Sequence, residues 1–576
     1  MQDNQLVLID QVIAERQEAR AVALPEATAF EVFACECALA DEDLSAEEVE
    51  AGVVGGGGDG AIDGVYVLLG DTLLAEDSDI FQEDFKASQV AKGTSLRLIL
   101  VQAKRETSFT ETAIDLATSS TRRLLNLGED EDDLAEYYSR DLIARLTLFR
   151  TALQKLATRH PKVQIKFVYA TRGRTSEINT RVKLKARDLE VDFSNAAAGG
   201  EGSVEFLGGA ELWERAGRQP SYTLQLSYKE SATSGTSHVA LVSLRDYFNF
   251  LTDENNGLRR HIFDWNVRDY QGDVEVNKEI ADSLDSASSP EFWWLNNGIT
   301  IICSRATIIG KTYSLDDVQI VNGLQSSHTI HRYLSSAPAD HPAFGRSVLV
   351  RILVTEDPAT RDLVIRATNR QTSVPAASLR ATDDIQRSIE TYFSGNGWYY
   401  DRRKNYYRNI GKSPERIVSI PLLAQAVMAM GLSQPHNSRA RPSSLLKRDE
   451  DYQKIFSSKV PLAVYLWLAK AQREIDGFLL TEGAGTTPQE RNNLRFHLAM
   501  LAAMRLHGRK VYAPQQLAKI AEEDTSVADA DLPFLLGELR DAYYEFGDMH
   551  GYSDDKSAKG SEFVEYLFNR ISNNDN

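Results

Sequence analysis

Cysteine is scarce in this sequence, with three residues, Cys35, Cys37 and Cys303, in a chain of 576. An odd number of cysteines cannot form a complete disulfide framework, and their spacing contains no C-x-x-C pair of the kind that binds zinc. The scarcity therefore argues against a disulfide-stapled secreted protein and against a cysteine-based zinc site. We expect a protein of a reducing compartment.

Long hydrophobic runs are also absent. The N-terminal segment MQDNQLVLIDQVIAERQEAR lacks the basic stretch followed by an apolar stretch that marks a secretory signal. The most apolar segments, PLAVYLWLAKA and RFHLAMLAAMRL, are too short to span a bilayer and contain charged residues. The sequence therefore predicts a cytoplasmic location and no membrane partner.

Basic residues are outnumbered by acidic ones. The chain has 64 Lys and Arg against 83 Asp and Glu, which gives a formal net charge of −19. Such an excess of negative charge repels phosphate and argues against a protein that coats nucleic acid through bulk electrostatics. Any contact with nucleic acid must therefore come from a local basic patch.

The composition and periodicity are those of a multidomain globular protein. Apolar residues make up 42% and charged residues 26% of the chain, and the length indicates roughly three or four domains. We predict an α/β multidomain architecture with three parts. Residues 1–220 form a mixed sheet with flanking helices, residues 221–415 an α+β region, and residues 416–576 an α-rich C-terminus.

Periodicity also places individual elements of the first part. Helical spacing covers residues 1–50 with a break near Asp41, and further helices are expected at about 107–127 and 133–158. Three segments have the composition of strands, with an acidic loop between the first two: GVYVLL, SLRLILVQAK and VQIKFVYAT.

A glycine-rich stretch, VVGGGGDGAIDGVYVLLG, covers residues 53–70. It is not a Walker A phosphate loop, because no Lys-Ser or Lys-Thr pair follows the glycines. It is not a dinucleotide-binding loop either, since strand-forming residues follow where a helix would have to begin. What remains is an aspartate at the start of a strand. We favour Asp63 over Asp59, because Asp63 adjoins the strand whereas Asp59 can form an Asx turn with its own backbone.

The strand SLRLILVQAK ends in polar residues. Because side chains alternate across a strand, Leu100, Gln102 and Lys104 share one face, while Val101 and Ala103 share the other. One face can therefore offer a polar pair at its end while the opposite face is buried.

The segments GAIDG and VQAK together resemble the PD-(D/E)xK nuclease core in the form used by Mrr-type restriction endonucleases, with Gln in the place of the usual acid. The resemblance implies a restriction-endonuclease-like fold for residues 1–220 and a Mg²⁺ site in which Mn²⁺ can substitute. Asp63 then binds the metal, and Gln102 and the backbone carbonyl of Ala103 complete its ligands. Lys104 positions the attacking water and stabilises charge on the phosphate. Mg²⁺ suits such a site because it prefers oxygen ligands and retains several waters.

An acid from an N-terminal helix often joins this core. Glu31 in AFEVF is the candidate, and Glu36, about one helical turn further on, is the alternative. The competing interpretation is structural: Asp63 is a turn aspartate, Lys104 a strand-end lysine, and the helical glutamates are solvated.

Further along the chain, several segments resemble the abortive-infection phage-resistance (AIPR) family. The resemblance covers roughly residues 225–410 and implies a role in bacterial defence against phage. It is carried by NVRDYQGDVEVN, NNGIT, IVNGLQ, ATNRQTSVPAASLRATDDIQ and WYYDRRKNYYR.

Two sites in this region are candidates for binding phosphate or nucleic acid. Asn322 and Gly323 join a strand to a helix, and such a junction can bind an anion through helix N–H groups, with Gln325 as a further donor; an ordinary capped junction is the alternative. Basic and aromatic residues interleave in WYYDRRKNYYRN, where Arg402, Arg403 and Lys404 can neutralise phosphates beside stacking rings. Core-edge packing is the alternative there.

Two further segments in the sequence have simpler interpretations. Asn297 and Gly298 suit a tight type I′ hairpin turn. The basic stretch 172–187 could lie along a DNA backbone, although solvated helix faces have the same composition.

The sequence thus predicts a Mg²⁺-dependent DNA endonuclease that acts in anti-phage defence, as a homodimer if it cuts both strands. A phage-derived or nucleotide trigger is expected to activate it. The alternatives are a non-catalytic defence protein that senses nucleic acid or a nucleotide, and an RNA-cleaving nuclease with the same metal site.

Overall fold

The structure is a computed structural model that describes residues 4–574 apart from 43, 55–56, 83–84, 198, 218–222, 254–255, 264–274, 286–289, 339, 370–382, 403, 410, 441–445 and 447. The chain divides into two compact units. The first unit comprises Met1–Arg218, Arg387–Arg402 and Lys412–Asn576, and the second comprises Gln219–Gln386 and Arg403–Gly411. The N-terminal and C-terminal parts of the chain therefore pack together in the first unit.

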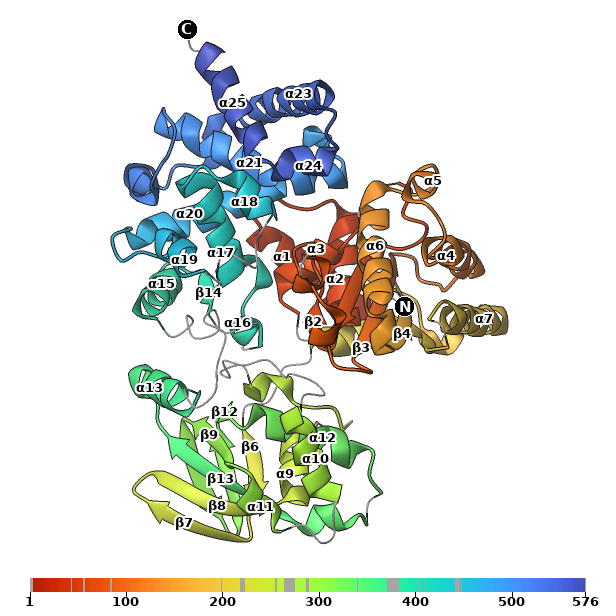
Figure 1. The fold of residues 1–576 in the computed structure, drawn as a ribbon, viewed down its shortest axis with the longest axis vertical. Helices are drawn as coiled ribbons and strands as arrows, with labels where there is room; N and C mark the ends of the chain where they lie inside the picture. Colours follow the sequence, from red (N-terminus) through yellow and green to blue (C-terminus); the bar gives the residue numbers. More distant parts are fainter. Residues whose placement is uncertain are drawn as a thin grey trace. The chain divides into compact units, whose positions relative to one another are not determined.

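The N-terminal part of the first unit contains a five-stranded sheet with the order β2-β1-β3-β4-β5. Strands β2, β3 and β4 of this sheet are labelled in Figure 1. β1 is antiparallel to β2 and β3, whereas β3, β4 and β5 run parallel. The three strands predicted from the sequence are confirmed as β1, β3 and β4. The bounds are β1 Gly64–Leu69, β2 Thr72–Leu73, β3 Ser95–Lys104, β4 Lys162–Thr171 and β5 Glu201–Leu207.

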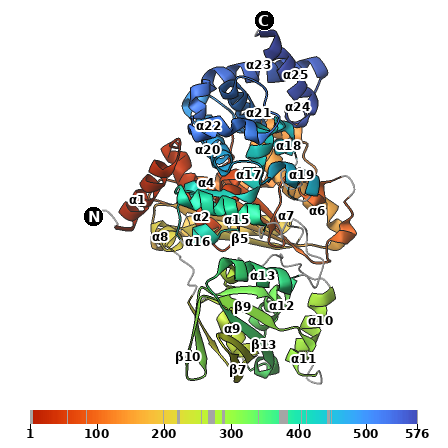
Figure 2. The same ribbon diagram turned by 90° about the vertical axis from the view of Figure 1, so that its left-hand side faces the viewer.

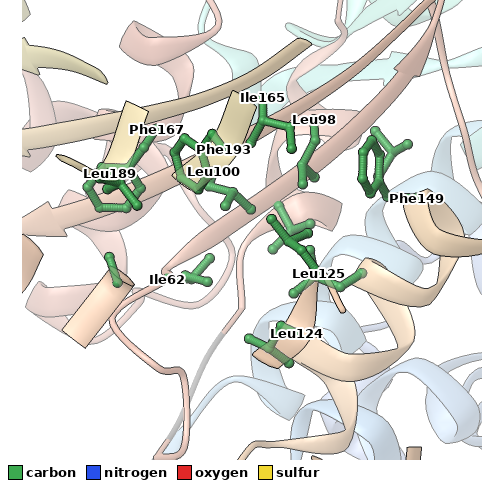
Figure 3. Close-up of a cluster of buried hydrophobic side chains, with 14 of the residues drawn as sticks. Ile62, Leu98, Leu100, Leu124, Leu125, Phe149, Ile165, Phe167, Leu189 and Phe193 are labelled. Atoms are coloured by element: carbon green, nitrogen blue, oxygen red, sulfur yellow. The ribbon is translucent and has the colours of Figure 1, made fainter. Parts of the chain in front are cut away.

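Helices cover both faces of this sheet. Leu98 and Leu100 of β3 belong to a core shared with α4, α6 and α7 (Figure 3), whereas Ile99 and Val101 belong to a core shared with α1, α2 and α8. The alternation predicted for β3 is therefore confirmed. Burial of each Leu or Ile side chain stabilises the folded state by about 1.5–3 kcal/mol. The helices are α1 Asn4–Ala19, α2 Glu26–Ala38, α3 Ala46–Gly52, α4 Glu111–Leu124, α5 Glu131–Ala135, α6 Arg140–Lys155, α7 Thr180–Ala196 and α8 Gly209–Ala216.

The helix predicted at about 133–158 is confirmed over most of its length as α6, but a separate short helix, α5, precedes it. Ser139 lies between them in an extended conformation, and its hydroxyl accepts a hydrogen bond from the N–H of Leu142 at 3.3 Å. A serine in this position satisfies an N–H group that the helix itself cannot, and so begins a new helix.

The C-terminal part of the first unit is rich in helices, as predicted. α20 and α21 pack against each other (Figure 2). α21 begins with a capping box at Thr487, and Gly508, in the left-handed region, follows its last residue. None of the described helices combines the length and apolar character needed to span a bilayer. The elements are α15 Asp384–Gly395, β14 Tyr399–Asp401, β15 Ile417–Ser419, α17 Ile420–Ala426, α18 Pro435–Ala440, α19 Asp449–Ile455, α20 Leu462–Leu479, α21 Pro488–His507, α22 Ala518–Glu522, α23 Leu532–His550, α24 Asp554–Lys559 and α25 Ser561–Asn574.

The second unit contains two sheets around its own core. The sheet β12-β9-β13-β8-β7 is mixed, because β13 is parallel to β9 and antiparallel to β8, while the sheet β10-β11-β6 is antiparallel. The elements are β6 Leu224–Ser227, β7 Glu230–Ser234, β8 Ser237–Ser243, α9 Leu244–Leu251, α10 Glu275–Asp285, α11 Phe292–Leu295, β9 Ile299–Cys303, β10 Arg305–Ile309, β11 Thr312–Asp316, β12 Gln319–Asn322, α12 Leu324–Ser335, β13 Ser347–Val354, α13 Pro358–Asn369 and α16 Tyr406–Asn409.

The hairpin turn predicted at Asn297 and Gly298 is wrong. A short helix, α11, precedes these residues, so they join a helix to β9. A type I′ turn needs positive φ at both central residues, and only Gly298 has it, at +76°. A Cβ atom at position 298 would lie 2.8 Å from the carbonyl oxygen of Leu349, so this glycine allows β13 to approach closely.

Candidate functional site

Asp63 lies where the glycine-rich loop enters β1. Its N–H donates to the carbonyl of Val101 at 2.7 Å, which extends the pairing of β1 with β3. Its carboxylate is 4% exposed, and Oδ2 accepts hydrogen bonds from the N–H of Ala103 at 2.7 Å and from Nε2 of Gln102 at 2.5 Å. The structure therefore brings together Asp63, Gln102 and Ala103, the three metal ligands predicted from the sequence.

The loop before Asp63 is shaped by its other aspartate and by glycine. Oδ1 of Asp59 accepts a hydrogen bond from the N–H of Ala61 at 2.8 Å, which confirms the expected Asx turn. Gly58 and Gly60 have φ of +80° and +60°, and a Cβ atom at position 60 would lie 2.6 Å from Oγ of Ser120. Positions 55 and 56 of the stretch lie outside the described residues.

Glu31 on α2 joins this site. A Cβ atom at position 64 would lie 2.7 Å from Sγ of Cys35, so Gly64 allows α2 to pack tightly against the start of β1. Glu31 is half-buried, and its carboxyl group interacts electrostatically with Asp63 and with Lys104. The alternative acid, Glu36, is instead buried and forms an ion pair with Arg16 of α1.

Lys104 ends β3, and its charge lowers the pKa of both carboxyl groups. It is half-buried and pairs with Thr171 of β4 in the parallel register. Within the described part of the chain its ammonium group makes no hydrogen bond and no ion pair. A cation that is not held by an ion pair is available to an anionic substrate.

Ionisation of the two carboxyl groups is unfavourable in their surroundings. Burial raises the pKa of Asp63 to about 6, even though the N–H of Ala103 and the charge of Lys104 lower it. Burial, and then repulsion by Asp63, raise the pKa of Glu31 to about 7. Paired carboxyl groups with raised pKa values in one place are typical of functional sites.

The donor atoms fit Mg²⁺. Gln102 is fully buried, and its Oε1 has no hydrogen-bond partner among the described residues. An unsatisfied buried oxygen is costly unless something else binds it. Mg²⁺ is commonly bound by one or two carboxylates together with neutral oxygens and waters. No three His, Cys, Asp or Glu side chains in the described ranges form a metal-binding group.

The junction at Asn322 and Gly323 is confirmed as a strand-to-helix connection. Gly323 has φ of +101°, and a Cβ atom there would lie 2.4 Å from Cδ1 of Ile299. The Ser327 hydroxyl is buried between Tyr247, at 2.7 Å, and the carbonyl of Gly323, at 2.8 Å. Gln325 is half-buried at the start of α12. A phosphate site here stays a prediction.

The basic cluster at 402–404 is only partly described. Arg402 is buried, and its Nε lies 2.7 Å from Oε2 of Glu390. Lys404 is exposed, and Arg403 lies outside the described residues. The enclosure of Arg402 is not visible in the sequence, because its partner Glu390 lies on α15, 12 positions earlier in the chain.

Comparison with known proteins supports one of the two resemblances. Residues 263–531, a little under half of the chain, match the family model described as AIPR protein. The match extends beyond the limit of 410 expected from the motifs and into the helical C-terminal part. The NVR motif and residues 370–382 lie outside the described residues. No curated protein and no solved structure matches the chain significantly. Residues 263–531 are therefore similar to the AIPR family.

Proposed function

We propose that this protein is a Mg²⁺-dependent endonuclease that hydrolyses DNA phosphodiester bonds in anti-phage defence. The observation that carries the proposal is the contact of the buried Asp63 carboxylate with the N–H of Ala103 and with Gln102, whose Oε1 has no partner among the described residues. The charges of Glu31 and Lys104 act on the same carboxylate or on each other. A restriction-endonuclease-like fold for the N-terminal sheet is part of the proposal. The AIPR match supports the defence role, since the family is associated with abortive-infection resistance to phage.

Each residue of the site has a distinct task in this proposal. Asp63, Oε1 of Gln102 and the carbonyl of Ala103 would hold the metal ion, with Glu31 as a further carboxylate. When bound, Mg²⁺ would supply Lewis-acid stabilisation and lower the pKa of a water molecule. The ammonium group of Lys104 would orient the attacking water and stabilise the negative charge that develops on the phosphate.

Cleavage is expected to require a divalent ion. The full-length protein is incubated with plasmid, phage genomic DNA and total RNA in Mg²⁺, in Mn²⁺ and in EDTA, with and without extract of phage-infected cells as a source of trigger. DNA products in either metal and none in EDTA are the expected result. Products from RNA alone indicate an RNA-cleaving enzyme, and metal-independent binding without cleavage indicates a sensor. Intact DNA under every condition contradicts the proposal.

Cutting of both strands by a domain with one active site favours a homodimer, which is part of the proposal. Linear plasmid as an early product, together with a dimeric mass in solution, is the expected combination. Accumulation of nicked circles by a monomer contradicts this part alone.

Gln102→Glu is expected to tighten Mg²⁺ binding by about tenfold, because an added carboxylate increases the charge of the ligand set. Gln102→Met, which keeps the chain length but removes Oε1, is the matched control and is expected to weaken binding. Both affinities are measured by isothermal titration calorimetry. If both folded variants bind Mg²⁺ as the native protein does, Gln102 has a structural role only.

A further inference from the structure

The helix α3 leads directly into the loop that carries Asp63. Val53, the residue after α3, forms a β-bridge with Gly64, and the N–H of Val54 donates to the carbonyl of Asp63 at 2.8 Å. The hydroxyl of Tyr66 on β1 donates to the carbonyl of Val49 on α3 at 2.8 Å. The position of α3 therefore sets where the loop begins and where Asp63 lies.

An arginine of the C-terminal part holds α3 from the other side. Nη2 of Arg473 on α20 lies 2.9 Å from Oε1 of Glu47 and 2.8 Å from the carbonyl of Ile417, and its Nη1 lies 3.9 Å from Oε2 of Glu50. Glu47 also accepts a hydrogen bond from the N–H of Ser419 at 3.2 Å. Both Glu47 and Glu50 lie on α3, so one half-buried guanidinium contacts this helix at two points.

A second set of ion pairs extends the same network to the helix that carries Glu31. Arg20, at the end of α1, is ion-paired with Glu50 and lies 3.6 Å from Glu415, which precedes β15. Arg16 on α1 is ion-paired with Glu36 on α2 at 2.5 Å. The loop that carries Asp63 and the helix α2 that carries Glu31 are therefore both connected by ion pairs, through α3 and α1, to the C-terminal part.

Arg473 lies in the region that matches the AIPR family, whereas Asp63 lies outside it. α20 packs against α21 and α22 within the C-terminal part, so its own position does not depend on Glu47. Removal of the Arg473 side chain would leave the half-buried carboxylate of Glu47 without its cation and Glu50 with Arg20 alone, which loosens the attachment of α3. The expected consequence is movement of α3 rather than loss of the C-terminal helices.

We infer that Arg473 is a positioning residue for the Asp63 site, through which the AIPR-like helical region controls whether Asp63 and Glu31 are placed to bind a metal ion. This inference rests on the proposed metal-binding role of that site. It predicts that a change in the position of α20 alters metal affinity without any contact between α20 and the metal ion.

The test compares Arg473→Ala and Arg473→Lys with Arg540→Ala in the full chain. Arg540 is the control because its ion pair, with Glu490 at 2.7 Å, lies within the C-terminal part. Mn²⁺ affinity is measured by calorimetry, and amide exchange of residues 53–64 by mass spectrometry. Arg473→Ala is expected to weaken Mn²⁺ binding at least about tenfold, as loss of supporting groups around metal ligands does, and to speed exchange in 53–64. Arg473→Lys should retain part of the native Mn²⁺ affinity and part of the native protection of residues 53–64. Arg540→Ala should change neither the Mn²⁺ affinity nor the exchange of these residues.

If Arg473→Ala does not fold, Glu47→Gln, which retains the hydrogen bonds but removes one charge, takes its place with the same expected direction. Native Mn²⁺ affinity and native exchange of 53–64 in the folded variant overturn the inference. If the native protein binds no Mn²⁺, the proposed function fails instead, and the exchange of 53–64 still reports whether Arg473 holds the loop.

Discussion

Asp63→Asn is expected to abolish cleavage and, at the same time, to stabilise the metal-free protein at neutral pH. Burial raises the pKa of Asp63 from an ordinary 3.8 to about 6, so ionisation of this carboxyl group is unfavourable in the folded state. Asn retains an oxygen that can accept the hydrogen bonds of Ala103 and Gln102 but carries no charge. The loss of cleavage follows because the neutral amide is a much weaker ligand for Mg²⁺.

The sign of the pH dependence follows from the direction of the shift. The folded state keeps the Asp63 proton up to about pH 6, whereas the unfolded chain releases it near pH 3.8. Between these values the folded state binds more protons, so the contribution of this group to stability falls as pH rises. A rise of the pKa from 3.8 to about 6 corresponds to about 3 kcal/mol of unfolding free energy. Asp63→Asn should be more stable than the native protein by about this amount at pH 8 and by much less at pH 4.

Urea unfolding in EDTA at pH 4 and pH 8 measures this effect. Asp59→Asn is the matched control, because Asn also forms Asx turns and Asp59 is half-exposed; its effect on stability should stay within about 0.5 kcal/mol, and its cleavage should persist. Added Mg²⁺ should stabilise the native protein and not Asp63→Asn. A destabilised Asp63→Asn protein at pH 8 would show that the charge of Asp63 stabilises the fold, and would falsify this account.

The proximity of Asp63 to Gln102 was predicted from the resemblance of GAIDG and VQAK to the PD-(D/E)xK core, because the long insertion between the two segments means that spacing alone cannot join them. Alternation along SLRLILVQAK assigns Gln102 and Lys104 to one face. The structure pairs Gly64 with Val101, which brings Asp63 beside Ala103. Local rules therefore place the two polar residues of β3, whereas the pairing of β1 with β3 depends on long-range contacts.

Other features of the site could not be read from periodicity. The ion pair between Glu47 and Arg473 joins residues 426 positions apart, and charged residues on amphipathic helices commonly face solvent. The short helix α11 was missed because its four residues, FWWL, contain too few turns to show a helical period. The packing of the C-terminal helices with the N-terminal sheet depends on the same long-range contacts.

Lys104→Met is expected to reduce cleavage at least about 100-fold while leaving stability below about pH 6 almost unchanged. The loss follows because a preorganised charge that stabilises a transition state is typically worth this much. Stability in that range is little affected because the carboxyl groups of Asp63 and Glu31 are then largely protonated, the ammonium group makes no ion pair or hydrogen bond in the described part of the chain, and Met keeps most of the apolar stem. Arg105→Met is the matched control, since Arg105 is the next residue along the chain and is ion-paired with Glu26 at an exposed position.

The pH profile of the residual activity separates an electrostatic role of Lys104 from a purely structural one. Lys104 lowers the pKa values of both Asp63 and Glu31, so its removal allows both to rise. The ionised carboxylates needed to hold the metal are then present only at higher pH, and the acidic limb of the profile should move upward. Lys104→Arg, which retains the charge, should keep the native limb. A Lys104→Met protein that cleaves at the native rate with the native profile would place the chemistry elsewhere in the chain.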